Sequence, residues 1–596
     1  MSKHGANRVK GRGRIAALLV LCCLVFVVFF ARLAWMQFAM ADHYAAKAAE
    51  ASSASYTVEQ HAARGAIVDR NGTVLARDTT VYDLYLRVPA PPDTNLQETV
   101  QTVQAITGGK DVETQLAAFC SAVSAGELLV MESLDSGTME ALYQAGLVQS
   151  GAVRLAARGV RSCPQGTLLP HVLGFTGPIT AEAWPAAQAK GLAMDSIVGQ
   201  CGLEAAYDDL LRGQDGRLLI NTGLDGAVRT TVQKEEATPG NTLVLTVDAG
   251  LQTALQAALQ ERIQTLQTTA PAGSGRECQA GAALVVDVKT GGILAAANWP
   301  GYDLNLYRST YSDLAADDGA PLLDRVFQGL YAPGSAFKPA VAAAALDAGF
   351  DPNATVNCTG RYLYYSGYQP GCLQYGHAGP VDLRTALEHS CNIFFYDVGR
   401  RLGVDTFSAM AQRLGLASPT GVEVDEAQGR LTRSTDDNYQ AGLTLMAAIG
   451  QGNTAVTPAQ LAVYAATLAN NGQRPTMHFA DRAVDVASGQ VVWQYTPAFT
   501  TVEGGETVFG PIRDGMKRMA QTTRVLREAP VVCAAKTGSP QLADTLPNGN
   551  HYVNSVLIGY APADDPQIAV AVVLEYGGGG SNAAPILRAV LDAYFG

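Results

Sequence analysis

Residues 15–30, near the amino terminus, contain no charged side chain, and this run constrains the fold more than any other feature of the sequence. It follows the basic residues Lys3, Arg8, Lys10, Arg12 and Arg14. An apolar helix of about 20 residues spans a bilayer, and positive charge before it holds the amino terminus in the cytoplasm. We therefore predict a cytoplasmic tail over 1–14 and a single membrane anchor over 15–36. Everything after about residue 40 is expected to lie outside the cytoplasm.

The competing interpretation of this region is a cleaved signal peptide. Ala39-Met40-Ala41 has the small-x-small form of a cleavage site. The apolar run is longer than the roughly 7–15 residues of a signal-peptide core, which favours an anchor that is retained.

The composition indicates a folded protein of several domains. The chain has 596 residues, of which 48% are hydrophobic and 16% charged, which argues against general disorder. The net charge is −12 and no basic stripe follows the first residues, which argues against nucleic-acid binding.

The cysteines and histidines show no familiar ligand spacing. No C-x-x-C pair or H-E-x-x-H helix occurs, so we expect no metal and no cofactor. The sequence leaves open whether Cys358 and Cys372 form a disulfide. His377 is expected to be structural, and Cys391 to serve packing.

Strand and helix patterns divide the exported part of the chain in two. Asn71-Gly72 lies between two short apolar runs and predicts a hairpin. Asn95 to Ala118 has helical composition. Residues 37–237 contain no group of residues suited to catalysis, and they are interpreted as an elongated mixed α/β pedestal or dimerisation-type domain.

Residues 238–596 predict a second domain of the α+β class. Ala282 to Val288 and Ile293 to Ala297 form a hairpin pattern, and two more strands are expected near the carboxyl terminus, at Ser555 to Tyr560 and Gln567 to Leu574. Helical stretches fill the middle. Strands from both ends of the domain suggest one antiparallel sheet covered by helices.

Three short motifs in the second domain carry the chemistry. They are Ser335-Ala336-Phe337-Lys338, Ser390-Cys391-Asn392 and Lys536-Thr537-Gly538-Ser539. Each occurs by chance in long chains, but their order and context point to one site.

Ser335 and Lys338 are three residues apart, so on a helix they share one face. A buried lysine with a lowered pKa accepts a proton from a hydroxyl that attacks a carbonyl. Pro339 requires the helix to begin within about a turn before it. This requirement places Ser335 at the helix start, where backbone N–H groups face developing negative charge.

The other two motifs suit substrate handling. Ser390 can pass a proton to the leaving amine, and Asn392 can hold the substrate backbone. Lys536 and Thr537 suit a peptide carboxylate, and Gly538 leaves room for a ligand backbone to approach.

The three motifs resemble those of penicillin-binding proteins and serine β-lactamases. The wider context resembles class B penicillin-binding proteins, the monofunctional D,D-transpeptidases. It comprises Arg64-Gly65-x-Ile67-x-Asp69-Arg70-x-Gly72, Gly202-Leu203-Glu204, Pro333-Gly334-Ser335, Gly450-Gln451-Gly452 with Thr457-Pro458, and Gly559-Tyr560-Ala561-Pro562.

This resemblance implies a role for each residue of the motifs. Ser335 would be the acylated nucleophile, Lys338 its base and Ser390 a proton relay. Asn392 would orient the substrate. Lys536, Thr537, Gly538 and Ser539 would bind it, with the backbone N–H groups of Ser335 and Ser539 forming the oxyanion hole.

The implied function is D,D-transpeptidation of peptidoglycan stem peptides, with β-lactam antibiotics trapped as esters on Ser335. A carboxypeptidase, a β-lactamase and a non-catalytic β-lactam sensor or scaffold are the alternatives. The anchor and the long amino-terminal module argue against a hydrolase. By resemblance, a SEDS-family glycosyltransferase would be the partner.

Overall fold

A computed structural model describes most of the chain. The described residues are 7–40, 54–60, 62–88, 94–108, 111–122, 126–194, 196–222, 228–372, 377–547 and 549–596. They fall into two compact units: unit 1 holds Met1–Ala62 and Gln214–Thr238, and unit 2 holds Ala63–Gly213 and Pro239–Gly596.

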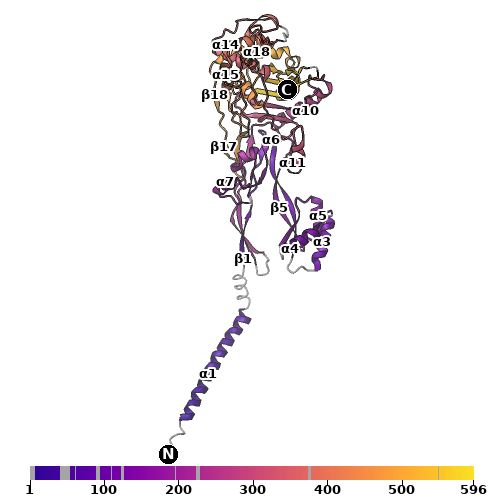
Figure 1. Ribbon diagram of the computed structural model, residues 1–596. Helices are drawn as coiled ribbons and strands as arrows, with labels where there is room; N and C mark the ends of the chain where they lie inside the picture. The colour runs from indigo at the N-terminus through magenta and orange to yellow at the C-terminus, as the bar shows by residue number, and fades with distance from the viewer. Residues whose placement is uncertain are drawn as a thin grey trace, which may run out of the picture. The chain divides into compact units, whose positions relative to one another are not determined.

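Unit 1 contains the amino-terminal helix and a small sheet. Helix α1 (Asn7–Ala34) is followed by a single π-helical turn (Trp35–Ala39). The stretch Ala16–Phe38 is long and apolar enough to cross a membrane. The sheet has three antiparallel strands in the order β1-β8-β9 (Figure 1). These strands are β1 (Ala54–Gln60), β8 (Gly216–Thr222) and β9 (Val228–Glu235).

Unit 2 begins with a seven-stranded sheet built from distant parts of the sequence. Its strands are β2 (Ile67–Val68), β3 (Val74–Val88), β4 (Gly126–Met131), β5 (Val153–Ser162), β10 (Thr242–Leu245), β16 (Ala480–Val484) and β17 (Val491–Gln494). The predicted hairpin at Asn71-Gly72 is confirmed, since β2 and β3 pair antiparallel on either side of it. On its other side β2 pairs in parallel with β10, so the start of the pedestal and the start of the second domain share one sheet.

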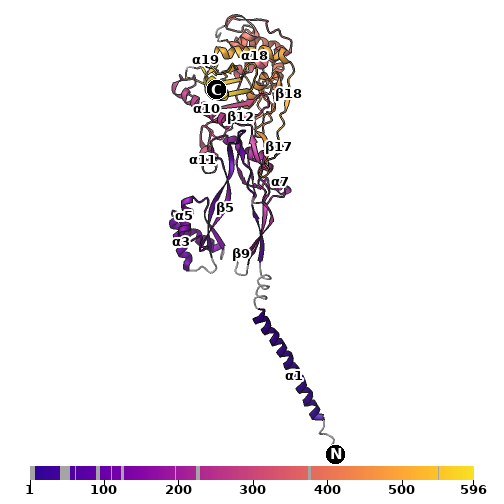
Figure 2. The ribbon, with the colours of Figure 1, turned by 180° about the vertical axis from the view of Figure 1, so that it is seen from behind.

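The far end of β3 carries a small helical subdomain. Helices α3 (Thr94–Ile106), α4 (Val112–Ala122) and α5 (Ser136–Gln144) pack with β3, β4 and β5 around a separate apolar core (Figure 2). The helical composition expected over Asn95 to Ala118 is confirmed, and it forms two helices, α3 and α4. The first ends at Ile106, shortly before Gly108, which takes a positive φ of 76°, a conformation common just after the end of a helix.

The second sheet of unit 2 confirms the antiparallel sheet predicted from distant strands. Its order is β12-β11-β23-β22-β19, and every neighbouring pair is antiparallel. The strands are β11 (Gly281–Asp287), β12 (Ile293–Trp299), β19 (Ala534–Gly538), β22 (Ser555–Ala561) and β23 (Ile568–Leu574).

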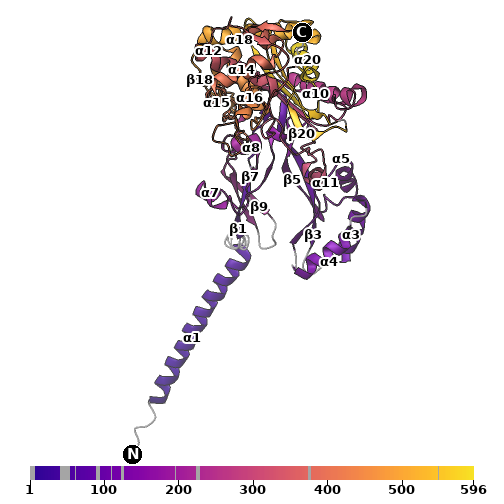
Figure 3. The ribbon, with the colours of Figure 1, turned by 45° about the horizontal axis from the view of Figure 1, so that its top comes forward.

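Side chains of this sheet alternate between two apolar cores. In β11, Leu284 faces the larger core and Val285 the smaller one, as the two-residue period of a strand dictates. The smaller core is closed by α10 (Ala249–Thr269) and α20 (Ala584–Phe595), which lie against each other (Figure 3). The larger core holds α12 (Lys338–Asp347), α14 (Asn392–Leu402) and α17 (Pro458–Ala469). Both faces of the sheet are therefore covered by apolar cores.

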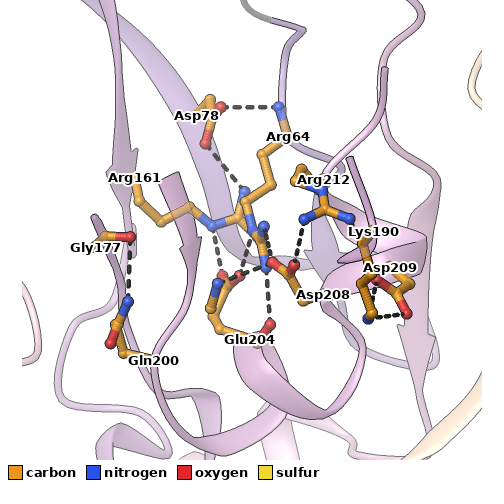
Figure 4. Close-up of polar contacts among 11 residues, drawn as sticks. Arg64, Asp78, Arg161, Gly177, Lys190, Gln200, Glu204, Asp208, Asp209 and Arg212 are labelled. Carbon is orange, nitrogen blue, oxygen red and sulfur yellow. Dashed lines mark hydrogen bonds and ion pairs between the residues drawn. The ribbon is translucent and has the colours of Figure 1, made fainter. Parts of the chain in front are cut away.

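A network of buried charges joins the long strands to the rest of unit 2 (Figure 4). Arg64 donates from Nε to Glu204 at 2.6 Å and from Nη1 to Asp208 at 2.7 Å. Arg161 of β5 donates to the second oxygen of Glu204 at 2.6 Å and to Asp78 of β3 at 3.2 Å. Glu204 is only 1% exposed. Removing one partner of such a pair leaves a buried charge unpaired, at a cost of about 3–5 kcal/mol. These residues therefore hold β3 and β5 against the short helices α8 (Gly202–Ala206) and α9 (Asp208–Leu211).

Candidate active site

Ser335 lies in a short helical turn that leads into α12. Gly334–Phe337 form a 3₁₀ turn, and α12 begins at Lys338 with Pro339 as its second residue. The expected α-helix from Ser335 is thus a 3₁₀ turn in its first part. In a 3₁₀ turn residues three apart eclipse each other, so Ser335 and Lys338 still share a face. Ser335 is half-buried, so part of its surface remains exposed to solvent.

Lys338 is fully buried and bonded to the second motif. Its Nζ donates to the backbone oxygen of Ser390 at 2.7 Å, to Ser390 Oγ at 3.1 Å and to Asn392 Oδ1 at 2.7 Å. The ring of Phe395 lies 5.6 Å from the same nitrogen. These three oxygen acceptors fix the position of the amine. None of the three is a carboxylate, so none of them adds a negative charge that would favour the protonated amine.

Ser390 links the two lysines of the site. Its Oγ also accepts from Lys536 Nζ at 3.0 Å, so one hydroxyl lies between two amines. Ser390 has a φ of 56°, a backbone conformation that costs a non-glycine residue energy and is concentrated at functional sites. The hydroxyl is therefore placed to pass a proton between Lys338 and a group near Lys536.

The electrostatics of the site favour a neutral amine. Burial lowers the pKa of Lys338 to about 7. Burial, together with the nearby charge of Lys338, lowers the pKa of Lys536 well below its usual value. A lysine with a pKa near neutrality is suited to general-base catalysis at physiological pH, and a substrate carboxylate beside Lys536 would favour its charged form.

Close backbone packing brings the third motif against the turn that holds Ser335. A Cβ added to Gly538 would overlap the carbonyl oxygen of Pro333, and one added to Gly334 would lie 2.9 Å from the Pro540 nitrogen. We expected Gly538 to admit a ligand backbone. The close approach in the structure is to the protein's own turn, so this glycine sets the distance between β19 and Ser335.

The structure brings all eight predicted site residues together at this junction. Thr537 is half-buried and Ser539 is exposed, while Ser539 Oγ accepts a hydrogen bond from Gly580 N at 2.8 Å. We did not assign a site role to Gly450 or Gly580. The carbonyl of Gly450 accepts from Gly334 N at 2.9 Å. In the sequence, the contact between Gly580 and Ser539 is indicated only by the glycine-rich run at 577–580.

A cluster of possible metal ligands lies behind the second motif. The ligand atoms of Cys358, Cys372, His377 and Cys391 all lie within 4.8 Å of one another. Among the described residues, no disulfide joins Cys358 to Cys372. Instead, Cys372 Sγ accepts from the backbone N–H of Asn392 at 3.4 Å. Three thiols and one imidazole form a donor set that suits tetrahedral Zn²⁺. The sequence predicted no metal here because the ligands are spread from 358 to 391 and form no short motif.

We expect the purified full-length chain to carry about one zinc ion, held by these four side chains. The ion would fix the loop that carries Ser390 and Asn392, because Cys391 lies between them. Cys391→Ser should lose most of the metal and unfold at a lower temperature, since structural zinc contributes folding energy. Elemental analysis and thermal melts measure both. Cys163→Ser, a buried cysteine outside the cluster, is the control. Metal-free wild type, or equal loading of Cys391→Ser, would contradict the assignment.

Comparisons with known proteins agree with this geometry. The penicillin-binding protein transpeptidase domain matches residues 281–592, and the penicillin-binding protein dimerisation domain matches residues 59–245. The peptidoglycan D,D-transpeptidase MrdA of Acinetobacter baumannii is 28% identical over 98% of this chain and 87% of its own length. The peptidoglycan D,D-transpeptidase PbpA of Mycolicibacterium smegmatis is 32% identical over 66% of this chain and 79% of its own length.

A solved structure shows the same fold over nearly the whole chain. That structure concerns the structural coordination of polymerization and crosslinking by a peptidoglycan synthase complex. It superposes with a TM-score of 0.75 at 29% identity, covering 98% of each chain. The matched transpeptidase domain alone spans more than half of the residues. The chain therefore belongs to the penicillin-binding protein transpeptidase family, as a class B member.

Proposed function

We propose that this chain is a peptidoglycan D,D-transpeptidase that works through an acyl-enzyme on Ser335. The observation that carries the proposal is the hydrogen-bonded series from Lys338 through Ser390 Oγ to Lys536, set beside a partly exposed Ser335. This series supplies a base, a relay and a second amine that a substrate carboxylate would hold in its charged form, and these are the parts that acyl transfer requires.

In the first half of the reaction, Ser335 Oγ attacks the carbonyl between the two terminal D-alanines of a stem peptide. Its proton passes to neutral Lys338. The N–H groups of Ser335 and Ser539 stabilise the oxyanion, while Asn392 orients the peptide and Lys536 with Thr537 binds its free carboxylate. When the tetrahedral intermediate collapses, the C–N bond breaks. Ser390 passes the proton to the leaving amine, and D-alanine departs.

In the second half, an amine of a neighbouring stem attacks the ester and loses its proton to the Lys338–Ser390 pair. The new amide is the cross-link, and Ser335 regains its proton. A β-lactam undergoes only the first half of the reaction. Its C–N bond breaks when Ser335 attacks the ring carbonyl, but the nitrogen remains tethered to the acyl group, so the ester on Ser335 persists.

We test the reaction type with the full-length protein in detergent, a stem-peptide donor ending in D-Ala-D-Ala, and a stem peptide with a free amine as acceptor. We expect cross-linked peptide to exceed hydrolysed donor at saturating acceptor. Mass spectrometry measures both products. Hydrolysis that dominates at every acceptor concentration would make the chain a carboxypeptidase, and rapid turnover of penicillin would make it a β-lactamase.

We further propose that the chain is oriented with residues 1–14 in the cytoplasm, an anchor over 15–36 and the catalytic domain outside. The basic residues before the apolar run support this orientation. Residues 37–237 would act as a pedestal and 238–596 as the catalytic domain. A separate SEDS-family glycosyltransferase would supply the glycan strands, supported by the synthase complex in which the similar structure was solved.

A further inference from the structure

Glu575 follows directly after β23 and binds two buried side chains. Its Oε1 accepts from the Tyr331 hydroxyl at 2.7 Å and from Arg325 Nε at 2.9 Å. Its own backbone N–H donates to the Ala280 carbonyl at 2.9 Å, which extends the sheet by one residue. The Arg325 side chain is 4% exposed and that of Glu575 is 26% exposed. The carboxylate is thus a fixed acceptor that is mostly protected from water.

Both partners of Glu575 belong to the segment that runs into the nucleophile. Arg325 also donates to the carbonyls of Gly319 and Ala320, at 2.8 and 2.9 Å. Tyr331 exchanges two backbone hydrogen bonds of 2.9 Å with Val456. Only Ala332, Pro333 and Gly334 separate Tyr331 from Ser335, so a shift of the tyrosine is passed to the nucleophile turn.

Beyond Glu575 the chain forms a loop that reaches the third motif. Tyr576 N donates to Asn554 Oδ1 at 2.9 Å, and Gly578 N donates to the Val553 carbonyl at 2.9 Å. The loop ends at Gly580, whose N–H donates to Ser539 Oγ at 2.8 Å. One residue therefore connects the segment before Ser335 with the loop that contacts Ser539.

We infer that Glu575 is a positioning residue that sets the spacing between the backbone N–H groups of Ser335 and Ser539. The inference rests on the proposed function, in which these two groups stabilise the oxyanion. Such donors act only when they lie about 2.7–3.1 Å from the oxyanion, and loss of one slows the chemical step by about 10²–10³-fold. Glu575 touches no reacting atom. It acts through Tyr331 and Arg325 on one side and through its own loop on the other.

If Glu575 only stabilised the fold, its replacement would affect acylation no more than the replacement of another half-buried carboxylate. Glu423 is a matched control for this comparison. Glu423 also accepts a hydrogen bond from a tyrosine hydroxyl, that of Tyr207, at 3.0 Å. It also accepts from the N–H groups of Phe479 and Ala480. Neither Tyr207 nor Phe479 belongs to a segment that carries a catalytic motif. Glu423→Gln therefore removes an equivalent charge without moving either N–H group of the oxyanion hole.

The experiment measures acylation by a fluorescent penicillin under stopped flow, using full-length wild type, Glu575→Gln, Tyr331→Phe and Glu423→Gln. The concentration dependence separates the acylation rate constant from the dissociation constant of the initial complex. We expect Glu575→Gln to lower the rate constant about tenfold and to change the dissociation constant by less than about twofold. Tyr331→Phe should lower the rate constant by about threefold. Glu423→Gln should change neither constant.

The double variant Glu575→Gln/Tyr331→Phe tests whether both residues act through one contact. Relative to wild type, its rate constant should fall by less than the product of the two single effects, because the two side chains share a hydrogen bond. If Glu575→Gln does not fold, judged by its circular dichroism and melting temperature, Tyr331→Phe decides alone, since it removes a single hydroxyl.

Rate constants of Glu575→Gln and Tyr331→Phe equal to that of Glu423→Gln would overturn the positioning role. An effect on the dissociation constant alone would also overturn it. A wild-type protein that is not acylated at all would instead remove the proposed function, so the two failures are distinguishable.

Discussion

Ser335→Ala is expected to abolish covalent labelling of the chain by fluorescent penicillin. The ester that holds the antibiotic requires the hydroxyl oxygen of Ser335. Of the other serine hydroxyls among the described site residues, Ser390 Oγ is held by both lysines and Ser539 Oγ accepts from Gly580. Fluorescence of the protein band after denaturing electrophoresis measures the label. The expected result is no signal above background at any penicillin concentration.

The matched control for this experiment is Ser309→Ala. It removes a hydroxyl that donates to the Leu306 carbonyl at 2.9 Å, at the start of α11 (Tyr307–Ala316). It should label like wild type. Peptide mapping of the labelled wild type should place the adduct on the peptide that contains Ser335. Persistent labelling of Ser335→Ala, with the adduct on another residue, would reassign the nucleophile.

Lys338→Met is expected to slow acylation by about 10²–10⁴-fold, the range for loss of a general base. In wild type the acylation rate should rise with pH through about 7 and level off above it, because burial lowers the pKa of Lys338 to about 7 and only the neutral amine accepts a proton. Below that pH the amine is charged and the rate falls. Rates measured from pH about 5 to about 9 test the profile.

The control for the pH profile is Lys517→Met, which removes an exposed lysine paired with Asp564. Its profile should follow that of wild type. The residual activity of Lys338→Met should lose the inflection near pH 7. An inflection that survives in this variant would assign the titration to another group.

Local patterns in the sequence were sufficient to predict several strands, one hairpin and the three motifs of the site. The hairpin at Asn71-Gly72 was predictable because that dipeptide favours the turn without help from distant residues. The strands over Ala282–Val288 and Gln567–Leu574 were predictable because their apolar composition and flanking turns are local. Ser335 and Lys338 were predictable as a pair because their spacing fixes their shared face in either kind of helical turn.

Contacts between distant parts of the chain were not predictable in this way. The parallel pairing of β2 with β10 joins residues 67 and 243, and no periodicity encodes which strand becomes a neighbour. The group of possible metal ligands was not predictable for the same reason, because Cys358 and Cys391 are distant in the sequence and lie together only in the folded chain. The contact of Glu575 with Tyr331 was not predictable either. In the sequence Glu575 is one polar residue after a strand, and Tyr331 is far from it. Gly538 was recognised, but its neighbour was not, since the approach of Pro333 is a property of the folded chain.

The pairing of β2 with β10 has a practical consequence for anyone who wishes to produce a soluble fragment for inhibitor screening. Asp69 caps the first turn of α10 through the Ala249 N–H at 3.0 Å, and Arg70 N donates to the Val247 carbonyl at 2.9 Å. A truncation that begins at residue 238 would remove both bonds and expose the edge of β10, and open strand edges promote aggregation. A fragment without this open edge therefore has to retain the stretch from Ala63 to Ala76, which holds β2 and the residues of β3 that pair with it, for example by joining it to the rest through a short flexible linker.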